Sequence, residues 1–380
     1  MRTIAIVGTN GKTTVCDLIS NILNKNGVPC GKIGTSGATF KEYNVETGFT
    51  TPDTPILYSI MADMVKSGAK TVCMELSAHA IYYNKANFKF DMAVFTNCTP
   101  EHLDFFKDFD EYCEVKLKAF ERKNSKICVV NSDSLLGKEI SCFRRGCITY
   151  GIENPADVFA IDIEQESYGT RFLINLFDTL YEIKSKLIGE FNVYNMLAAS
   201  TVCALCGVKT EDIANSLCEI NGVEGRMEKV CEKIKIYIDY AHTPDGLEKS
   251  LKTLKNISEN NKLICVFGCG GNRDRSKRCV MGEISGKIAD FTIITSDNPR
   301  FEDEDFIISQ IEGGIRKITH EYITVRDRES AIEYAVQMAN LGDYILIAGK
   351  GSEKYQEKMG VFKRFSDKEV ALNAVKLKYE

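Results

Sequence analysis

The chain has 380 residues, of which 44% are hydrophobic and 27% are charged, and its formal net charge is −5. This length exceeds what one hydrophobic core usually organises, so we expect two domains. The mildly acidic composition argues against nucleic-acid binding or an anionic-membrane surface as the main function. No apolar run is long enough to span a bilayer, and a strand-like segment begins at residue 3 with no signal peptide before it, so we expect a cytoplasmic protein.

The 15 cysteines lie mostly alone within apolar runs, where cysteine packs as a small hydrophobic residue. Cys203 and Cys206 form a CxxC pair in a helix-like stretch with no second pair nearby. Neither a zinc site nor a disulfide framework is therefore expected. An odd number of cysteines without a secretion signal fits reduced thiols.

Along the chain, apolar runs of strand length alternate with longer amphipathic stretches, a pattern typical of α/β proteins with mainly parallel sheets. Strands are predicted at Thr3–Val7, Thr71–Glu75, Met92–Thr96, Lys126–Val130, Ile234–Asp239, Leu263–Gly268, Phe291–Thr295 and Tyr344–Ala348. Helices are predicted at Thr13–Asn26, Pro55–Ser67, Asp110–Ala119, Val193–Cys206 and Thr210–Ser216. Residues 158–187 alternate like an antiparallel insert. A boundary near 221–224 predicts domains over residues 1–222 and 223–380.

The segment Gly8–Thr14 follows a predicted strand and opens a predicted helix. In that position, backbone N–H groups and the helix N-terminus can cradle phosphate, Lys12 can reach the outer phosphates and Thr13 can bind Mg²⁺. Ile6 stands where the longer phosphate-loop pattern has its first glycine. A glycine turn before a helix is therefore the alternative interpretation.

Two candidate metal ligands follow other predicted strands. Glu75 ends one strand, and His102 comes shortly after the strand that ends at Thr96. Ligands of open α/β sheets bind at the carboxyl ends of the strands. Each residue alone could be a satisfied polar group or a helix cap, but their positions on adjacent loops favour a shared site.

Nine motifs, taken in this order, resemble the Mur ligase family, and within it the UDP-N-acetylmuramoyl-tripeptide synthetases that add meso-diaminopimelate. They are Gly8–Thr14, Glu75, Phe95–Asn97, His102–Asp104, Phe191–Asn195, Gly225–Glu228, Asp239–Pro244, Phe267–Gly271 and Ala348–Gly351. The resemblance runs from residue 3 to about residue 372. It implies a P-loop central ATPase domain followed by a Rossmann-like C-terminal Mur ligase domain.

The resemblance also implies a reaction. ATP phosphorylates an acceptor carboxylate to an acyl phosphate, and the amine of an amino acid then displaces phosphate, so that an amide bond and ADP are formed. The implied catalytic residues are Lys12, Glu75, His102 and Lys116. Thr13 and Glu75 would hold one Mg²⁺ ion, and Glu75 and His102 a second. Lys116 would be carbamylated near the second ion, and a plain surface lysine is the alternative.

The family pattern implies a distributed nucleotide site. Its residues are Thr9, Asn10, Gly11, Lys12, Thr13, Thr14, Asn97, Asn192, Asn195, Arg226, Asp239 and His242. Since Arg226 and Asp239 follow the predicted boundary, the second domain is expected to close over ATP.

Residues 296–300 resemble the segment by which the family branch recognises diaminopimelate. Arg300 would bind the distal carboxylate bidentately, whereas the ammonium group of a lysine substrate would be repelled. The implied amino-acid site comprises Arg273, Asn298, Arg300, Gly349 and Glu353, with Glu353 suited to the distal ammonium group. A turn with an exposed arginine is the alternative.

The chain also departs from the family pattern. The phosphate loop begins at residue 8, where the family first has a domain that binds the UDP end of the acceptor. We therefore expect either an acceptor without UDP or a partner chain that supplies this surface. Lys85 replaces an arginine, Ala78 a serine, Phe106 and Ser352 histidines, and Asn272 an aspartate. Thr50, Thr51, Ser77, His79 and Lys85 remain as implied contacts to a muropeptide-like carboxylate.

Three functions follow from these observations. The leading hypothesis is a ligase for a diaminopimelate-like amino acid and a small carboxylate acceptor. The second is the same chemistry in natural-product or polyglutamate-type peptide assembly. The third is a catalytically silent nucleotide-binding partner protein, which the presence of Lys12, Glu75, His102 and Lys116 disfavours.

Overall fold

The computed structural model describes residues 1–166 and 168–379. The chain folds as two compact units, Met1–Asn221 and Gly222–Glu380, and the predicted boundary lies one residue further on. Residues 167 and 380, which fall within the predicted insert and the predicted second domain, lie outside the description. Each unit is built around a mainly parallel sheet with helices, so the predicted α/β class is confirmed.

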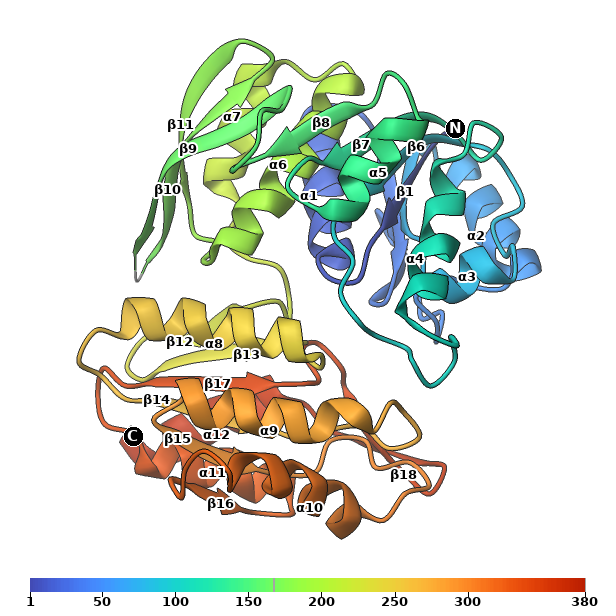
Figure 1. The fold of residues 1–380 in the computed structure, drawn as a ribbon. Helices are drawn as coiled ribbons and strands as arrows, with labels where there is room; N and C mark the ends of the chain where they lie inside the picture. The colour runs from blue at the N-terminus through green and yellow to red at the C-terminus, as the bar shows by residue number, and fades with distance from the viewer. Residues whose placement is uncertain (167, 380) are drawn as a thin grey trace. The chain divides into compact units, whose positions relative to one another are not determined.

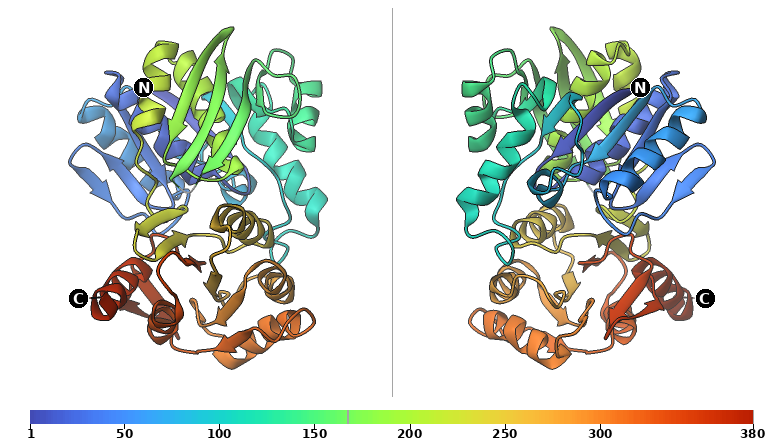
Figure 2. Two further views of the ribbon diagram at one scale, coloured as in Figure 1. Left: turned by 90° about the vertical axis from the view of Figure 1, so that its left-hand side faces the viewer. Right: turned by 90° about the vertical axis from the view of Figure 1, so that its right-hand side faces the viewer.

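The described residues of the first unit form an eleven-stranded sheet with the order β11-β10-β9-β8-β7-β6-β1-β5-β2-β3-β4. The strands are β1 (Arg2–Val7), β2 (Cys30–Gly34), β3 (Gly37–Phe40), β4 (Tyr43–Val45), β5 (Thr71–Glu75), β6 (Phe90–Phe95), β7 (Ser125–Asn131), β8 (Ile148–Gly151), β9 (Val158–Glu166), β10 (Gly169–Leu176) and β11 (Thr179–Ser185). Neighbours from β2 to β9 across the sheet are parallel. The predicted antiparallel insert is confirmed in β9 to β11, which Figure 2 shows together.

Helices cover both faces of this sheet (Figure 1). They are α1 (Lys12–Lys25), α2 (Thr54–Lys66), α3 (Ala78–Tyr82), α4 (Phe109–Leu117), the 3₁₀ helix η1 (Lys118–Phe120), α5 (Leu135–Phe143), α6 (Glu190–Leu205) and α7 (Thr210–Glu219). Alternate residues of β1 serve the two faces: Ile4 and Ile6 pack with α1, α6 and α7, whereas Ala5 and Val7 pack with α2 and α5. Successive side chains of a strand point to opposite faces, so both faces of the strand that carries the phosphate loop are buried.

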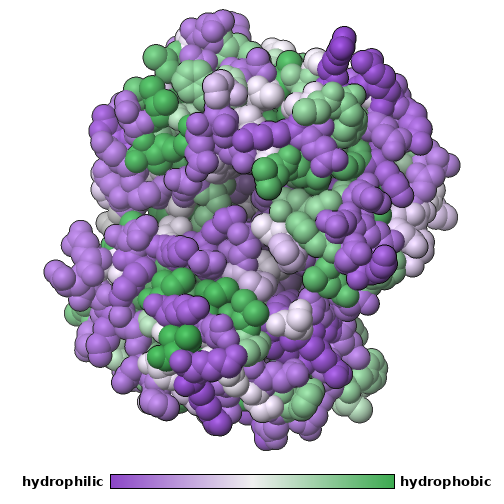
Figure 3. Space-filling view, viewed as in Figure 1, coloured by the Kyte–Doolittle hydropathy of each residue, from purple (hydrophilic) through white to green (hydrophobic). Residues whose placement is uncertain are grey.

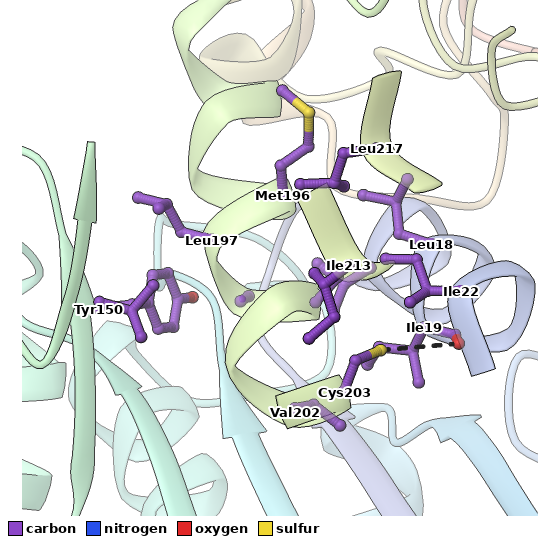
Figure 4. Close-up of a cluster of buried hydrophobic side chains, with 14 of the residues drawn as sticks. Leu18, Ile19, Ile22, Tyr150, Met196, Leu197, Val202, Cys203, Ile213 and Leu217 are labelled. Atoms are coloured by element: carbon purple, nitrogen blue, oxygen red, sulfur yellow. Dashed lines mark hydrogen bonds between the residues drawn. The ribbon is translucent and has the colours of Figure 1, made fainter. Parts of the chain in front are cut away.

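The packing of α6 on α1 matters for the site. Figure 4 shows Met196 and Cys203 of α6 close to Leu18, Ile19 and Leu217. These side chains are completely buried, and burial of each such side chain stabilises the fold by about 1.5–3 kcal/mol. The first turns of α6 are thereby fixed beside the first turn of α1.

The described residues of the second unit form a six-stranded sheet with the order β12-β13-β17-β14-β15-β16. Its strands are β12 (Glu228–Cys231), β13 (Lys235–Asp239), β14 (Leu263–Phe267), β15 (Phe291–Ile294), β16 (Tyr322–Thr324) and β17 (Tyr344–Ala348), and β18 (Tyr355–Lys358) pairs with β19 (Val361–Arg364) in a separate hairpin. The helices are α8 (Pro244–Ser258), α9 (Ser276–Ile288), α10 (Glu304–Ile315), α11 (Arg328–Met338) and α12 (Asp367–Tyr379). Within the six-stranded sheet, only the β12–β13 pair is antiparallel.

A buried ion pair links two helices of the second unit. The guanidinium of Arg328, at the start of α11, donates to both carboxylate oxygens of Asp367, at the start of α12, at 2.7 and 2.8 Å. Arg328 also donates to the carbonyl oxygens of Ser296 and Ala348. The pair therefore holds the ends of β15 and β17 as well as the two helices.

The face of the molecule in Figure 3 is largely hydrophilic, with hydrophobic side chains in separate patches. None of the helices in the described part of the chain is both long and apolar enough to cross a membrane.

Candidate active site

The first group of predicted site residues lies where the strand order of the first sheet reverses. After β1 the chain builds β2 and returns to β5 on one side, and then crosses to β6 on the other side. Loops at the carboxyl ends of β1, β5 and β6 therefore meet at a topological switch point, where open α/β sheets bind ligands.

The phosphate loop requires its two glycines because its neighbours approach the backbone closely. A Cβ atom on Gly8 would lie 1.9 Å from the Thr96 hydroxyl oxygen. Gly11 has a φ of 86°, and a Cβ atom there would lie 2.4 Å from Oδ1 of Asn195. Only glycine fits either position without displacing these side chains.

The loop after β6 fixes the phosphate loop by hydrogen bonds. The side chain of Asn97 accepts from the backbone N–H of Asn10 at 2.9 Å and donates to the Asn10 carbonyl at 3.1 Å. The Asn97 carbonyl accepts from the Thr9 N–H at 2.9 Å. Asn97, predicted as a nucleotide contact, is thus placed as a residue that positions the loop.

Lys12 folds back onto its own loop, where its ammonium group donates to the carbonyl oxygens of Gly8 and Thr9 at 3.0 and 2.8 Å. Helix α1 begins with Gly11 as N-cap, which supplies no capping side chain, while Thr13 and Thr14 are buried in its first turn. Backbone N–H groups at such a helix start favour an anion. Positive charge and N–H groups therefore gather at one end of α1.

Two predicted nucleotide residues on α6 are buried beside this loop. Nδ2 of Asn195 donates to Oδ1 of Asn192 at 3.0 Å, and Asn192 donates to the Ile188 carbonyl at 2.8 Å. Asn195 also contacts Gly11. The structure thus brings the α6 residues together with the phosphate loop.

Lys116 of α4 is buried against the phosphate loop and is only 1% exposed. Its Nζ donates to the Thr9 hydroxyl at 2.7 Å and lies 3.9 Å from the centre of the Tyr112 ring and 3.6 Å from Sγ of Cys98. Burial lowers the pKa of Lys116 to about 8, and the charge of Lys12 contributes to the lowering. The interpretation of Lys116 as a plain surface lysine is therefore wrong.

Two cysteines meet beside Lys116. Sγ of Cys98, in the loop after β6, lies 3.4 Å from Sγ of Cys113 on α4. A hydrogen bond from Cys113 and the charge of Lys116 lower the pKa of Cys98 to about 6, against the opposing effect of burial. Both thiols are partly exposed.

Glu75 ends β5 and is 2% exposed. Its carboxylate accepts from the backbone N–H of Thr35 at 2.9 Å and from the Thr35 hydroxyl at 3.2 Å. A Cβ atom on Gly34 would lie 2.1 Å from Oε1 of Glu75, so the β2 turn can hold this carboxylate only through a glycine. Thr35 is a contact that sequence reasoning missed, because β2 and its turn carried no recognisable motif.

Predicted acceptor residues surround Glu75. The Thr51 hydroxyl donates to the Glu75 carbonyl at 2.9 Å and accepts from the N–H of Ser77 at 3.0 Å. The hydroxyls of Thr50 and Thr35 lie 3.1 Å apart. Thr50, Thr51 and Ser77 are therefore brought together with the predicted metal ligand.

Two of the predicted site histidines, both in the first unit, pack against each other. Their rings, from His79 of α3 and His102, have centroids 4.9 Å apart in an edge-to-face arrangement. His102 has a φ of 59°, a left-handed conformation that is costly for a residue other than glycine and is concentrated at functional sites. Phe105 and Phe106 complete an aromatic wall on His79.

Lys85 lies beside the predicted acceptor segment. Its Nζ forms an ion pair with Asp53 at 2.6 Å and lies 5.2 Å from the centre of the Phe49 ring. The Thr54 hydroxyl donates to the Lys85 carbonyl at 2.8 Å. Residues 49–54 and Lys85 therefore form one surface, on which an ion pair lies beside an aromatic ring.

The predicted amino-acid residues gather in the second unit, at the carboxyl ends of the neighbouring strands β17, β14 and β15. Nδ2 of Asn298 donates to Glu353 at 2.9 Å, and the Lys350 ammonium donates to both Asn298 and Glu353 at 3.0 Å. Gly349 has a φ of 116°, and a Cβ atom there would lie 2.6 Å from Oδ2 of Asp297. Lys350, fully buried, was not predicted as a site residue.

Arg300 lies on the same edge of the second sheet. Nη1 of Arg300 donates to the Gly271 carbonyl at 2.9 Å, and its Nε lies 3.2 Å from a carboxylate oxygen of Glu357. Arg300 has a φ of 52°, and Arg273 is exposed on the adjoining loop. Glu357, which orients the guanidinium, lies in the β18–β19 hairpin and was missed because that hairpin was not predicted.

The three predicted nucleotide residues of the second unit cluster at the end of β13. Asp239 is buried and accepts from the N–H groups of Met227 and Tyr240 at 3.3 and 2.8 Å, and burial raises its pKa. Arg226 stacks on the Tyr240 ring at 4.2 Å, and Nδ1 of His242 lies 2.8 Å from the Tyr240 carbonyl. Asp239 therefore holds the turn that presents Arg226.

Comparison with protein families matches this geometry at both sheets. The Mur ligase middle domain matches residues 6–203, and the Mur ligase glutamate ligase domain matches residues 225–351. The chain belongs to the Mur ligase family. A Mur ligase is an ATP-dependent acid–amino-acid ligase that forms ADP, so the predicted family and enzyme class are confirmed.

Individual relatives agree with this assignment. The chain is 40% identical to the UDP-N-acetylmuramoyl-L-alanyl-D-glutamate–2,6-diaminopimelate ligase of Alkaliphilus oremlandii, over 98% of this chain and 77% of the relative. It is 38% identical to the enzyme of the same name from Geobacillus kaustophilus, over 99% and 79%. A solved structure of a ligase of this name is 32% identical, with a TM-score of 0.71, over 100% of this chain and 79% of that chain. Folylpolyglutamate synthase of Mycobacterium tuberculosis shares the fold (TM-score 0.76, 15% identity, 92% and 88% coverage).

Proposed function

We propose that this Mur ligase joins 2,6-diaminopimelate to UDP-N-acetylmuramoyl-L-alanyl-D-glutamate. The observation that carries the proposal is the meeting of Asn298, Arg300 and Glu353 at one edge of the second sheet. The relatives that cover nearly the whole chain carry this activity in their names. The predicted alternatives in other peptide-forming pathways are supported by fold similarity alone.

The chemistry of the amino-acid site fits diaminopimelate, which carries a carboxylate and an ammonium group at its distal end. Arg300 would bind that carboxylate, and Glu353, held by Lys350 and Asn298, would face the ammonium group. A guanidinium binds a planar carboxylate through two parallel N–H donors. Because Glu357 already pairs with Arg300, the substrate carboxylate must either share the guanidinium with Glu357 or displace it.

The acceptor carboxylate would lie beside Glu75, where Thr50, Thr51 and Ser77 present hydroxyl groups. Lys85 and His79 would contribute positive charge and an aromatic surface to the rest of the acceptor. A partner chain that completes this surface remains a separate proposal. Such a chain would bind beside the same acceptor residues.

The donor set also fits Mg²⁺, which usually binds one or two protein carboxylates together with phosphate oxygens and water. Thr13 and Glu75 would hold one ion, and Glu75, His102 and a carbamate on Lys116 would hold the second. No group of three or more His, Cys, Asp or Glu side chains that could hold a metal occurs in the described residues. When bound, Mg²⁺ would supply positive charge against the phosphate oxygens.

The environment of Lys116 fits carbamylation. Only a neutral amine attacks CO₂, and a pKa of about 8 leaves about a tenth of the lysine neutral at pH 7, against about one in three thousand at an ordinary lysine pKa. The modification converts a buried cation into an anion. Lys116 contacts a hydroxyl, an aromatic ring and a thiol.

The residues of the first unit would act mainly by positioning and by electrostatic stabilisation. Lys12 and the N-terminus of α1 stabilise the negative charge of the phosphoryl group during transfer. The loop after β6 keeps Thr9 and Asn10 fixed, so that little reorganisation is needed at the moment of reaction. In the second unit, Glu353 would hold the distal ammonium group and so orient the amino acid.

The proposal is tested by measuring ADP release and product mass with a panel of amino acids and acceptors. We expect turnover only when diaminopimelate and UDP-N-acetylmuramoyl-L-alanyl-D-glutamate are both present, with a product whose mass shows one new amide bond. If turnover with diaminopimelate occurs only with acceptors that lack UDP, the proposed acceptor is wrong. Turnover with glutamate on a polyglutamate-type acceptor would replace the whole proposal.

A further inference from the structure

The thiols of Cys98 and Cys113 lie together beside Lys116. We propose that Cys98 and Cys113 form a modification site, an oxidisable dithiol that hydroperoxides convert reversibly to a disulfide and thereby switch off the nucleotide site. This modification is separate from ligation, since neither thiol is among the residues expected to hold ATP, Mg²⁺ or the substrates.

The geometry of the two sulfurs carries the proposal. They lie 3.4 Å apart, and a disulfide needs about 2.05 Å, so closure requires a movement of about 1.4 Å. A disulfide would join Cys98, in the loop after β6, to Cys113 on the helix α4. Both residues are partly exposed, and hydrogen peroxide is small enough to approach side chains that are only partly exposed.

The reaction balances with one hydroperoxide. When the oxidant is hydrogen peroxide, the sulfur of Cys98 attacks the O–O bond, which breaks and yields a sulfenic acid and one molecule of water. The thiol of Cys113 then attacks the sulfenic sulfur, which forms the S–S bond and releases a second water. Two thiols are oxidised by two electrons, the peroxide is reduced, and a dithiol reductant reverses the link.

The consequence for the site follows from what surrounds each sulfur. Cys98 lies between Asn97 and Thr99, whose backbones bind Thr9 through hydrogen bonds of 2.9–3.2 Å. Cys113 precedes Lys116 by one turn of α4, and Lys116 donates to the same Thr9. Formation of the disulfide therefore displaces the two segments that hold the phosphate loop, which are the loop after β6 and the helix α4. Misplacement of a positioned group by about 1 Å can cost about 100-fold in rate.

The experiment treats the full chain with hydrogen peroxide, alkylates the remaining thiols and maps the peptides by mass spectrometry. A fluorescent ATP analogue reports nucleotide binding on the same samples. We expect a Cys98–Cys113 peptide, a loss of at least tenfold in analogue affinity, and recovery of both with dithiothreitol. Since neither readout needs diaminopimelate or an acceptor, failure here is distinguishable from failure of the proposed function.

Variants separate the dithiol from other cysteines. Cys113→Ser, with Cys113→Ala as a second variant, should bind the analogue like the wild type before oxidation and show no reversible loss after it. Cys142→Ser, at an exposed thiol on α5, should behave like the wild type throughout. Peroxide that oxidises Cys142 without linking Cys98 to Cys113 would overturn the proposal. So would a link that leaves analogue binding unchanged, or a reversible loss that persists in Cys113→Ser.

Discussion

The nucleotide site of the first unit and the amino-acid site of the second both occupy the carboxyl ends of parallel strands, but they hold their charges differently. In the first, Lys12 and Lys116 are held by carbonyl and hydroxyl oxygens. In the second, Arg300 and Lys350 are already paired with carboxylates. Burial lowers the pKa of Lys116, so this lysine loses its proton more readily. The carboxylate partners of Arg300 and Lys350 instead hold each cation in a fixed orientation.

Replacement of Lys116 should cause the largest effect. Lys116→Ala removes the amine that is expected to carry the carbamate, so turnover should fall by about 1,000-fold or more, an effect typical of losing a central electrostatic contact. Lys118→Ala, two residues further on and exposed, is the control and should stay near wild type. Short carboxylates should partly restore activity to Lys116→Ala. Full activity without any rescue would remove Lys116 from the site.

The buried pair in the second unit should show the next largest effect. Asp367→Asn leaves Arg328 without its charged partner at a fully buried position, which should lower the free energy of unfolding by about 3–5 kcal/mol. Thermal and urea unfolding would measure the loss of stability. Hydrogen exchange of the native protein would show that the loss lies in the second unit. An equal loss of exchange protection in β1 and α1, which belong to the first unit, would contradict the expectation that this pair stabilises the second unit alone.

A smaller effect is expected at Glu353. Glu353→Gln removes the negative charge opposite the distal ammonium group, so the KM for diaminopimelate should rise about tenfold, which corresponds to about 1.4 kcal/mol. The KM for ATP should change less than twofold. Glu369→Gln, at an exposed ion pair on α12, is the matched control. A parallel rise in both KM values would show a general disturbance instead of a specific contact.

The pH dependence should give the smallest effect. The neutral fraction of Lys116 rises about fivefold from pH 7 to pH 8 if its pKa is about 8, so activation by bicarbonate should grow over this interval. Because burial lowers this pKa, the unfolded chain binds the proton more tightly. The contribution of Lys116 to stability therefore increases as the pH rises from about 8 towards 10.5. Activation that is independent of pH would argue against a carbamate.

The sequence predicted the long parallel strands and the loops that follow them. β5 and β17 were predicted with their observed bounds, and the strand before Gly8 was predicted within one residue. Such strands are completely buried, so they appear as continuous apolar runs. The shorter strands β3, β4, β16, β18 and β19 were not predicted, because segments of three or four residues are too short to carry a clear periodicity.

The candidate sites likewise contain residues that the sequence predicted and residues that it did not. Residues in motifs, such as Lys12 and Glu75, could be named in advance, and the family and its activity followed from them. Their supports could not be named, because Thr35, Lys350 and Glu357 reach the site from other segments through folding. That Asn97 and Asp239 use their side chains on the backbone of neighbouring loops was also not visible in the sequence. Hydrogen-bond partners distant in the chain leave no local signal.

Arg300 is proposed to select the amino acid, and the ratio of kcat/KM for diaminopimelate to that for lysine is the sharpest measure of this role. We predict a strong preference for diaminopimelate in the wild type and a fall of about 100-fold or more in this ratio in Arg300→Ala, with the KM for ATP unchanged. Arg300→Lys should recover only part of the preference, because an ammonium group cannot bind a carboxylate bidentately. An unchanged ratio in Arg300→Ala would contradict the account.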